Sequence, residues 1–315
     1  MRHRPLLACV LLLGACFSSQ QKSTSSPQPS SPQERAPDYS ATIADPLGFL
    51  PRDSEIVLSL DAAQVRESAL WTAFEPRLLA AAGPELSTFQ TVCGFDPLQK
   101  LRGITVGIKG KEPDVEGVIV VSGFDRAQVM DCLARATKET GGAQIDGELV
   151  TIPVSDKGSA TVFTFVDAST VVLAYGKTAS KESLQAILAS GSPLRTSEAF
   201  SKLFATIDTD ASVWMVVNGR YIDDGSAALG ANLQAVFGSL TLRDGVAASV
   251  RLRLGDAGQA TNLASIVQGQ IGAAKSFFEK LEVKAEDVDL VVDASMTAQQ
   301  LATMVSMLGG MAGAP

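Results

Sequence analysis

A recurring polar phrase, an aspartate followed three residues later by a glutamine, is the first candidate for chemistry in this chain. It occurs at Asp61–Gln64, Asp125–Gln128 and Asp256–Gln259. A carboxylate beside an amide could bind a cation or position a proton. Each copy, however, follows a predicted strand and opens a predicted helix. There an aspartate accepts from the unpaired first-turn amides, and a glutamine at N3 can reach back to the cap. We therefore predict that the three aspartates are helix N-caps, with Thr297 and Gln300 as a variant before the last helix.

Two other phrases begin like ligand-binding loops but lack essential residues. "YGKTASK" at 175–181 contains Gly-Lys-Thr, yet the glycine that a phosphate-binding loop needs five positions earlier is replaced by Val171. "DTDAS" at 208–212 begins like a calcium loop, but Val213 and Gly219 stand where that loop needs glycine and glutamate. The sequence argues against a nucleotide loop and excludes an EF-hand, leaving a weak, irregular calcium site as the alternative at 208–212.

Three further groups have a chemical and a structural interpretation. Asp223 and Asp224 could pair for acid–base work, but such neighbours are typical of a solvated turn. Arg251 and Arg253 could clamp an anion on a sheet face, although we favour pairing with acids on neighbouring strands. Three methionines at helical spacing could line a lipid or partner groove or pack into the core; they are Met304, Met307 and Met311.

The scarcity of histidine limits the chemistry further. His3, the only histidine, lies in a segment that we expect to be removed. Its loss excludes Ser-His-Asp and Cys-His catalysis, histidine-ligated zinc and most haem ligation. No Gly-x-Ser-x-Gly elbow occurs, and no Ser-x-x-Lys phrase stands at a credible strand-to-helix start. We predict no catalytic residue, no metal site and no cofactor, and therefore no enzyme.

The N-terminus resembles the signal peptide and lipobox of bacterial lipoproteins. Basic "MRHRP" precedes a short apolar run that ends in Leu13-Gly14-Ala15-Cys16, and this run is too short to span a bilayer. In that family the cysteine thiol accepts a diacylglycerol, the peptide before it is removed, and the new amine is usually acylated, often with palmitate. The resemblance implies a signal peptide at 1–15 and a lipidated Cys16. Phe17, in place of an aspartate, favours the outer membrane. Secretory cleavage with a free Cys16 is the alternative.

A flexible tether should follow the anchor. Residues 17–44 are rich in Ser, Gln and Pro, with almost no large apolar residue before Tyr39, so they cannot bury enough surface to fold. Loss of Arg2 and Arg4 with the signal changes the formal net charge from −8 to −10. This acidic body argues against nucleic-acid partners. We expect contact with the membrane through the lipid, an envelope protein as a candidate partner, and no nucleotide.

Two cysteines remain in the body, in a compartment that permits disulfides. A bridge between Cys93 and Cys132 would close a loop of about 40 residues. Because Cys132 also shares an apolar stripe with Val129 and Leu133, two buried thiols are the alternative. We favour the disulfide.

The body alternates between strand and helix patterns and predicts an α+β protein with mainly antiparallel sheets. Strands and hairpins are expected at 54–60, 103–110, 117–124, 143–154, 160–176, 211–219, 239–255 and 287–295. Helices are expected at 62–82, kinked or divided at Pro76, and at 126–138, 179–189, 197–207, 227–237, 257–281 and 298–308. Each half then contains strand, helix, two strands, helix and strand. We predict two related halves, 45–208 and 209–310, followed by a tail at 311–315.

A second resemblance concerns the body. "FLPRDSEIVLSLD" at 49–61 resembles the Leu-Pro-x-Asp opening of uncharacterised bacterial lipoproteins and exported domains. "CGFDPLQKLRGITVGIK" and "GVIVVSGFDRAQVMDCL" are similar to segments of hypothetical lipoproteins from predatory and soil bacteria. This resemblance implies no activity.

The first functional hypothesis is a non-enzymatic envelope lipoprotein with a structural, adaptor or protein-binding role. The second is a carrier or chaperone for an apolar ligand, held between a curved sheet and the 257–281 helix. The third is a histidine-free hydrolase.

Overall fold

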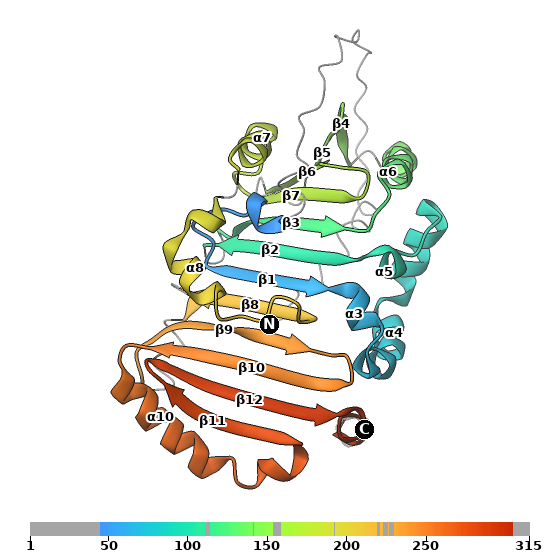
Figure 1. Ribbon diagram of the computed structural model, residues 1–315. Helices are drawn as coiled ribbons and strands as arrows, with labels where there is room; N and C mark the ends of the chain where they lie inside the picture. Colours follow the sequence, from blue (N-terminus) through green and yellow to red (C-terminus); the bar gives the residue numbers. More distant parts are fainter. Residues whose placement is uncertain are drawn as a thin grey trace.

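The computed structural model describes residues 45–110, 114–140, 142–153, 159–191, 193–218, 221–222, 226 and 230–304. They form one antiparallel sheet with the strand order β11-β12-β10-β9-β8-β1-β2-β3-β7-β6-β5-β4 (Figure 1). In chain order the strands are β1 (Ile56–Asp61), β2 (Gly103–Lys109), β3 (Glu116–Ser122), β4 (Gln144–Asp146), β5 (Leu149–Pro153), β6 (Ala160–Phe165), β7 (Thr170–Gly176), β8 (Val213–Asn218), β9 (Leu233–Thr241), β10 (Gly245–Leu254), β11 (Lys280–Glu286) and β12 (Asp289–Thr297).

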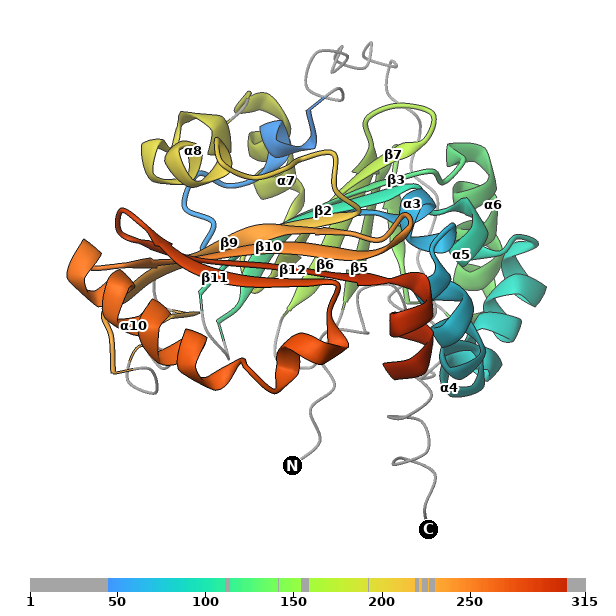
Figure 2. The same cartoon turned by 60° about the horizontal axis from the view of Figure 1, so that its bottom comes forward.

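Helices cover both faces of this sheet (Figure 2). We call one face the α8 face, because α7, α8, η2 and η3 pack on it, and the other the α10 face, because α4, α6 and α10 pack on it. The helical segments are η2 (Pro46–Phe49), α3 (Ala62–Arg66), α4 (Ala69–Cys93), α5 (Pro97–Lys100), α6 (Arg126–Thr140), α7 (Lys181–Ala189), η3 (Leu194–Thr196), α8 (Glu198–Phe204), α10 (Ala257–Gln270) and η5 (Ala274–Phe277). Residues 298–304 are also helical.

The buried core is divided between the two faces. On the α8 face, Val57, Val216 and Phe237 pack against Leu184 and Phe200 from the covering helices. The α10 face carries two separate cores. One lies under α4 and α6 at the β5–β7 end, and the other lies under α10 at the β10–β12 end. The middle of the α10 face therefore lies between two packed ends.

The expected helix near 227–237 is wrong from Leu233 onward. β9 begins at Leu233 and pairs with β8 on one side and with β10 on the other. A short apolar run fits the helical and the strand period almost equally well. Two flanking strands supply partners for the whole backbone of β9, so tertiary pairing decides the outcome. Residues 227–229 lie outside the described residues.

The expected helix at 257–281 is too long. α10 ends at Gln270, the short turn η5 follows, and β11 begins at Lys280. From Lys280 to Glu286 the sequence "KLEVKAE" alternates charged and apolar residues, which is the period of a half-buried strand. Val283 of this strand is buried in the core beneath α10.

The helix is not divided at Pro76, because α4 continues through Pro76 and Pro84. The helical region divides earlier, where Ser68 caps α4 by accepting from the backbone N–H of Trp71 at 3.1 Å. Both prolines lie inside the helix, where each lacks the N–H for one backbone hydrogen bond.

The predicted repeat of two related halves is not confirmed. The second half runs β8, β9, β10, α10, β11, β12, with Ser226 in a helical turn between β8 and β9, whereas the first half has the four strands β4–β7 between α6 and α7. The boundary at 208/209 separates α8 from β8. Because β8 pairs with β1, a single sheet crosses that boundary. The hairpins expected at 143–154 and 239–255 are present as β4–β5 and β9–β10.

Candidate functional site

The three aspartates of the recurring phrase all lie at helix starts. Asp61, Asp125 and Asp256 each accept a hydrogen bond at 2.9 Å from the backbone N–H three residues later. The expected reach of the glutamine to the cap backbone occurs only at Thr297, where Gln300 Oε1 accepts from the Thr297 N–H at 2.9 Å. In the first and third aspartate copies the glutamine amide instead donates to the carboxylate, at 3.1 and 2.6 Å. Because an ionised carboxylate is a stronger hydrogen-bond acceptor than a neutral group, the glutamine NH₂ group bonds to it.

The first copy also joins distant segments of the chain. Gln64 Nε2 donates to the carbonyl oxygen of Asp210 at 3.2 Å, and Gln64 Oε1 accepts from Ser212 Oγ at 3.1 Å. Ser212 is fully buried, and its Oγ accepts from the backbone N–H of Leu242 at 3.0 Å. This network connects α3, the segment before β8 and the β9–β10 hairpin.

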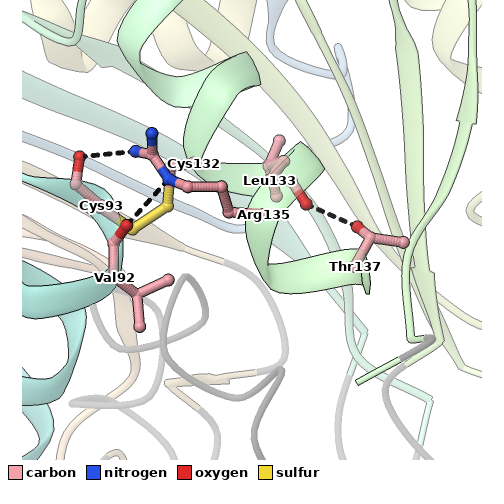
Figure 3. The surroundings of a disulfide bond; sticks show 6 residues. All are labelled: Val92, Cys93, Cys132, Leu133, Arg135 and Thr137. Atoms are coloured by element: carbon pink, nitrogen blue, oxygen red, sulfur yellow. Dashed lines mark hydrogen bonds between the residues drawn. A yellow bond between two sulfur atoms is a disulfide. The ribbon is translucent and has the colours of Figure 1, made fainter. Parts of the chain in front are cut away.

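Cys93 and Cys132 form a disulfide between α4 and α6 (Figure 3). Their Cα atoms lie 4.6 Å apart and both residues are buried. Arg135 donates to the carbonyl oxygens of Val92 and Cys93 at 3.1 and 3.2 Å, which ties α6 to the end of α4 beside the bridge. Cys16, the expected lipid site, lies outside the described residues.

Arg251 and Arg253 pair with acids on neighbouring strands. Arg251 bonds Glu286 at 2.8 Å, and Arg253 binds both carboxylate oxygens of Asp289 at 2.8 and 2.9 Å. The hydrogen bond with Asp289 raises the pKa of Arg253 above its ordinary value. Both arginines therefore belong to an ion-paired ladder on the α8 face, and they do not form an anion clamp.

The Gly-Lys-Thr phrase ends β7. Lys177 pairs with Asp114, and Thr178 Oγ1 donates to Glu116 at 2.6 Å. At the calcium-like phrase, the Asp210 N–H donates to an Asp208 carboxylate oxygen at 3.0 Å, as in a local turn. The described residues contain no group of three potential metal ligands. Asp223, Asp224, Met307 and Met311 lie outside the described residues.

The middle of the α10 face carries a continuous apolar surface. Five strands in the order β10, β9, β8, β1, β2 each contribute three residues in register, and every one is apolar. The three rows of this apolar strip are Leu252-Val236-Val217-Ile56-Ile108, Val250-Gly238-Met215-Leu58-Val106 and Ala248-Leu240-Val213-Leu60-Ile104. At strand spacing it covers about 500 Å² of sheet.

The apolar strip is partly open, unlike the other face of the same strands. Met215 is 36% exposed, and its neighbours Leu58 and Val217 are partly exposed. On the α8 face of the same strands, Val57 and Val216 are 1% exposed. α10 lies beneath one end of the face and α4 at the other (Figure 2). Patches of several hundred Å² on a monomer are often functional.

The helices beside the apolar strip expose large apolar side chains of their own. They are Phe74 and Leu79 on α4, Ile266 on α10 and Phe277 on η5. The strands at 54–60 and 211–219 could be predicted, but the open face could not. "VWMVV" is apolar at every position, which shows that both faces of that strand are apolar and does not show which face is open.

No protein-family model matches the chain, and no curated protein sequence matches it. Solved structures of a protein named TP0453 are similar in fold. Its crystal form I is 14% identical with a TM-score of 0.52, and the alignment covers 84% of this chain and 98% of that chain. Its crystal form III is 14% identical with a TM-score of 0.49, and the alignment covers 83% of this chain and 98% of that chain. At this identity, the likeness to form I shows a shared fold alone. Among the described residues, no helix is long and apolar enough to cross a membrane.

Proposed function

We propose that this protein is a non-enzymatic lipoprotein of the cell envelope that binds a partner protein through the apolar strip. A signal peptide at 1–15, a lipidated Cys16 and a tether at 17–44 would hold the folded body near the outer membrane. The observation that supports binding is the apolar strip itself, three rows of apolar residues across five strands that are partly open around Met215.

Burial of this surface by a partner would be favourable. Transfer of apolar area from water contributes roughly 25 cal/mol per Å². Interface cores are depleted of charged residues, and the apolar strip contains none. Exposed Phe74 and Ile266 on the flanking helices extend the apolar area beyond the sheet.

A second candidate function is the binding of an apolar small molecule on the same surface. The strip carries only aliphatic side chains and a glycine. A bound hydrocarbon would leave no side-chain polar group unpaired there, whereas protein interfaces usually include a polar rim. Phe277 and Ile266 are 51% and 57% exposed, and their helical segments lie on the same side of the sheet as the strip (Figure 2).

A photo-cross-linking residue at position 215 of the full chain, in intact cells, separates these alternatives. Position 247 is the control, because Ala247 is exposed on the opposite face of the same sheet. We expect a discrete protein adduct from position 215 and none from 247. A small lipid-like adduct at 215 would favour the second candidate. Equal labelling at both positions, or none at 215, would contradict both.

The anchor has a separate test. Cys16→Ser should release the chain from the membrane fraction and abolish incorporation of a labelled fatty acid. Retention of the label or of membrane attachment would show that the lipobox interpretation is wrong.

A further inference from the structure

A polar pocket of about 590 Å³ lies on the α8 face, the opposite face of the sheet from the apolar strip, and Leu60 is the residue that contributes to both. Its floor is formed by β1, β2, β3 and β7, and the segment 209–211 and Trp214 of β8 form one side. Pockets of 300–1,000 Å³ are typical of small-molecule sites. This pocket has three features that together indicate a ligand.

The first feature is a floor of hydroxyl groups. Ser59 and Thr105 face each other with 3.1 Å between their hydroxyl oxygens, and Ser122 and Thr170 are paired on the next two strands. Elsewhere on this face the same strands carry buried valines, which are Val57, Val118 and Val172. Hydroxyls in place of valines reduce the apolar area of a core. A hydroxyl has one donor and two acceptor positions, so these groups can bond to a polar ligand in addition to the bonds that they make within the protein.

The second feature is a tryptophan at the pocket wall. Trp214 is 6% exposed and its ring packs edge-on against Phe204 at 5.2 Å. Trp214 also lines the pocket. A tryptophan presents an apolar ring and one N–H donor, so a ligand in the pocket would pack against the ring and accept from that donor.

The third feature is a pair of arginines at the rim. Arg102 and Arg243 both line the pocket and are exposed, and no carboxylate of the described residues lies within ion-pair distance of either guanidinium. In contrast, Arg126, Arg195 and Arg253 are each paired with a carboxylate. Guanidinium groups bind carboxylate and phosphate in a bidentate manner.

Two carboxylates in the lining restrict the ligand further. Asp61 already accepts from the backbone and side-chain N–H groups of Gln64, whereas Asp210 lies in the exposed segment at the rim. An anion alone would be repelled by Asp210, but a ligand with hydroxyl groups could donate to it. We infer that the pocket binds a small hydroxylated organic anion, with its carboxylate or phosphate at Arg102 and Arg243 and its hydroxyl groups at the polar floor and Asp210.

Fluorescence can test this inference, because the chain has two tryptophans and only Trp214 lines the pocket. In the full chain carrying Trp71→Phe, Trp214 is the single reporter. The probes are glucuronate, a hydroxylated carboxylate, glucose 6-phosphate, a hydroxylated phosphate, and neutral glucose. We expect a saturable change with at least one of the two anions and none with glucose. The anion that acts distinguishes a carboxylate site from a phosphate site.

Arginine variants decide whether the binding occurs at the proposed groups. Arg102→Gln and Arg243→Gln should each weaken binding about tenfold or more, because each removes charged hydrogen bonds. Arg52→Gln is the matched control, since Arg52 is exposed, lies outside the pocket and has no ion-pair partner among the described residues. Unchanged unfolding midpoints would show that the variants fold. No response to either anion, an equal response to glucose, or an equal loss in Arg52→Gln would overturn the inference.

Discussion

Gln64 and Gln128 occupy the same position of the same phrase, but their surroundings differ. The Gln64 side chain makes three hydrogen bonds, to a carboxylate oxygen of Asp61, to the carbonyl oxygen of Asp210 and from Ser212 Oγ. The Gln128 side chain is exposed and makes none within the described part of the chain. Replacing each glutamine with alanine therefore compares a side chain that connects distant segments with one that lies only beside a helix cap.

The expected difference follows from counting the bonds lost. A typical intramolecular hydrogen bond contributes about 1 kcal/mol net to the free energy of unfolding. Gln64→Ala removes three, and the higher helix propensity of alanine restores a few tenths of a kcal/mol. We expect Gln64→Ala to lower the free energy of unfolding by about 2–3 kcal/mol, and Gln128→Ala to change it by less than about 0.5 kcal/mol.

Equilibrium urea unfolding measures this difference. The background should be the full chain with Cys16→Ser, so that no lipid affects the transition. Intrinsic fluorescence reports on the hydrogen-bond network of Gln64, because Trp214 lies in β8, just after Ser212. Equal losses in the two variants, or a loss below about 1 kcal/mol for Gln64→Ala, would refute the idea that the network joins the segments energetically.

Three further predictions concern stability. Reduction of the Cys93–Cys132 bridge, which spans 39 residues, should lower the free energy of unfolding by about 4 kcal/mol in the chain-entropy model; thiol titration of the oxidised protein should find neither thiol free. Asp289→Ala should lower it by about 3 kcal/mol, because it leaves a partly buried arginine unpaired; an effect below 1 kcal/mol in urea unfolding would contradict this. The hydrogen bond from the backbone N–H of Gln259 lowers the pKa of Asp256 below its ordinary value of 3.8. The cap therefore stabilises the fold above pH 3.8 and is lost as the pH falls through the lowered pKa. Asp256→Asn should make the free energy of unfolding fall less steeply as the pH is lowered, and should leave it almost unchanged at neutral pH. An equally steep fall in the variant and the parent would contradict this role of Asp256.

The helix caps show how far local sequence information reaches. Asp61, Asp125 and Asp256 accept from amides only three residues away, so their position depends on nearby residues alone. The hairpin turn at Asp146-Gly147 is likewise local, because glycine adopts the positive φ of 62° without strain. Such features could be predicted, since their partners are adjacent in the chain.

The errors share a different cause. The residues of β9 fit either secondary structure when read alone, and the strands β8 and β10 that pair with them decide between the two. Likewise, the bonds of Gln64 to Asp210 and Ser212 cross about half the chain, whereas Gln128 has the same local sequence motif and no such bonds.

The sequence by itself determined the α+β class, most strands and caps, and the N-terminal resemblance to lipoproteins, because these depend on composition, periodicity and short-range hydrogen bonds. The tertiary structure alone decided that the two halves share one sheet, that Met215 lies in an open apolar strip, and that Arg102 and Arg243 line one pocket. Whether a strand face is covered, and which distant side chains meet, depends on strand order and helix placement. No local pattern encodes these long-range features.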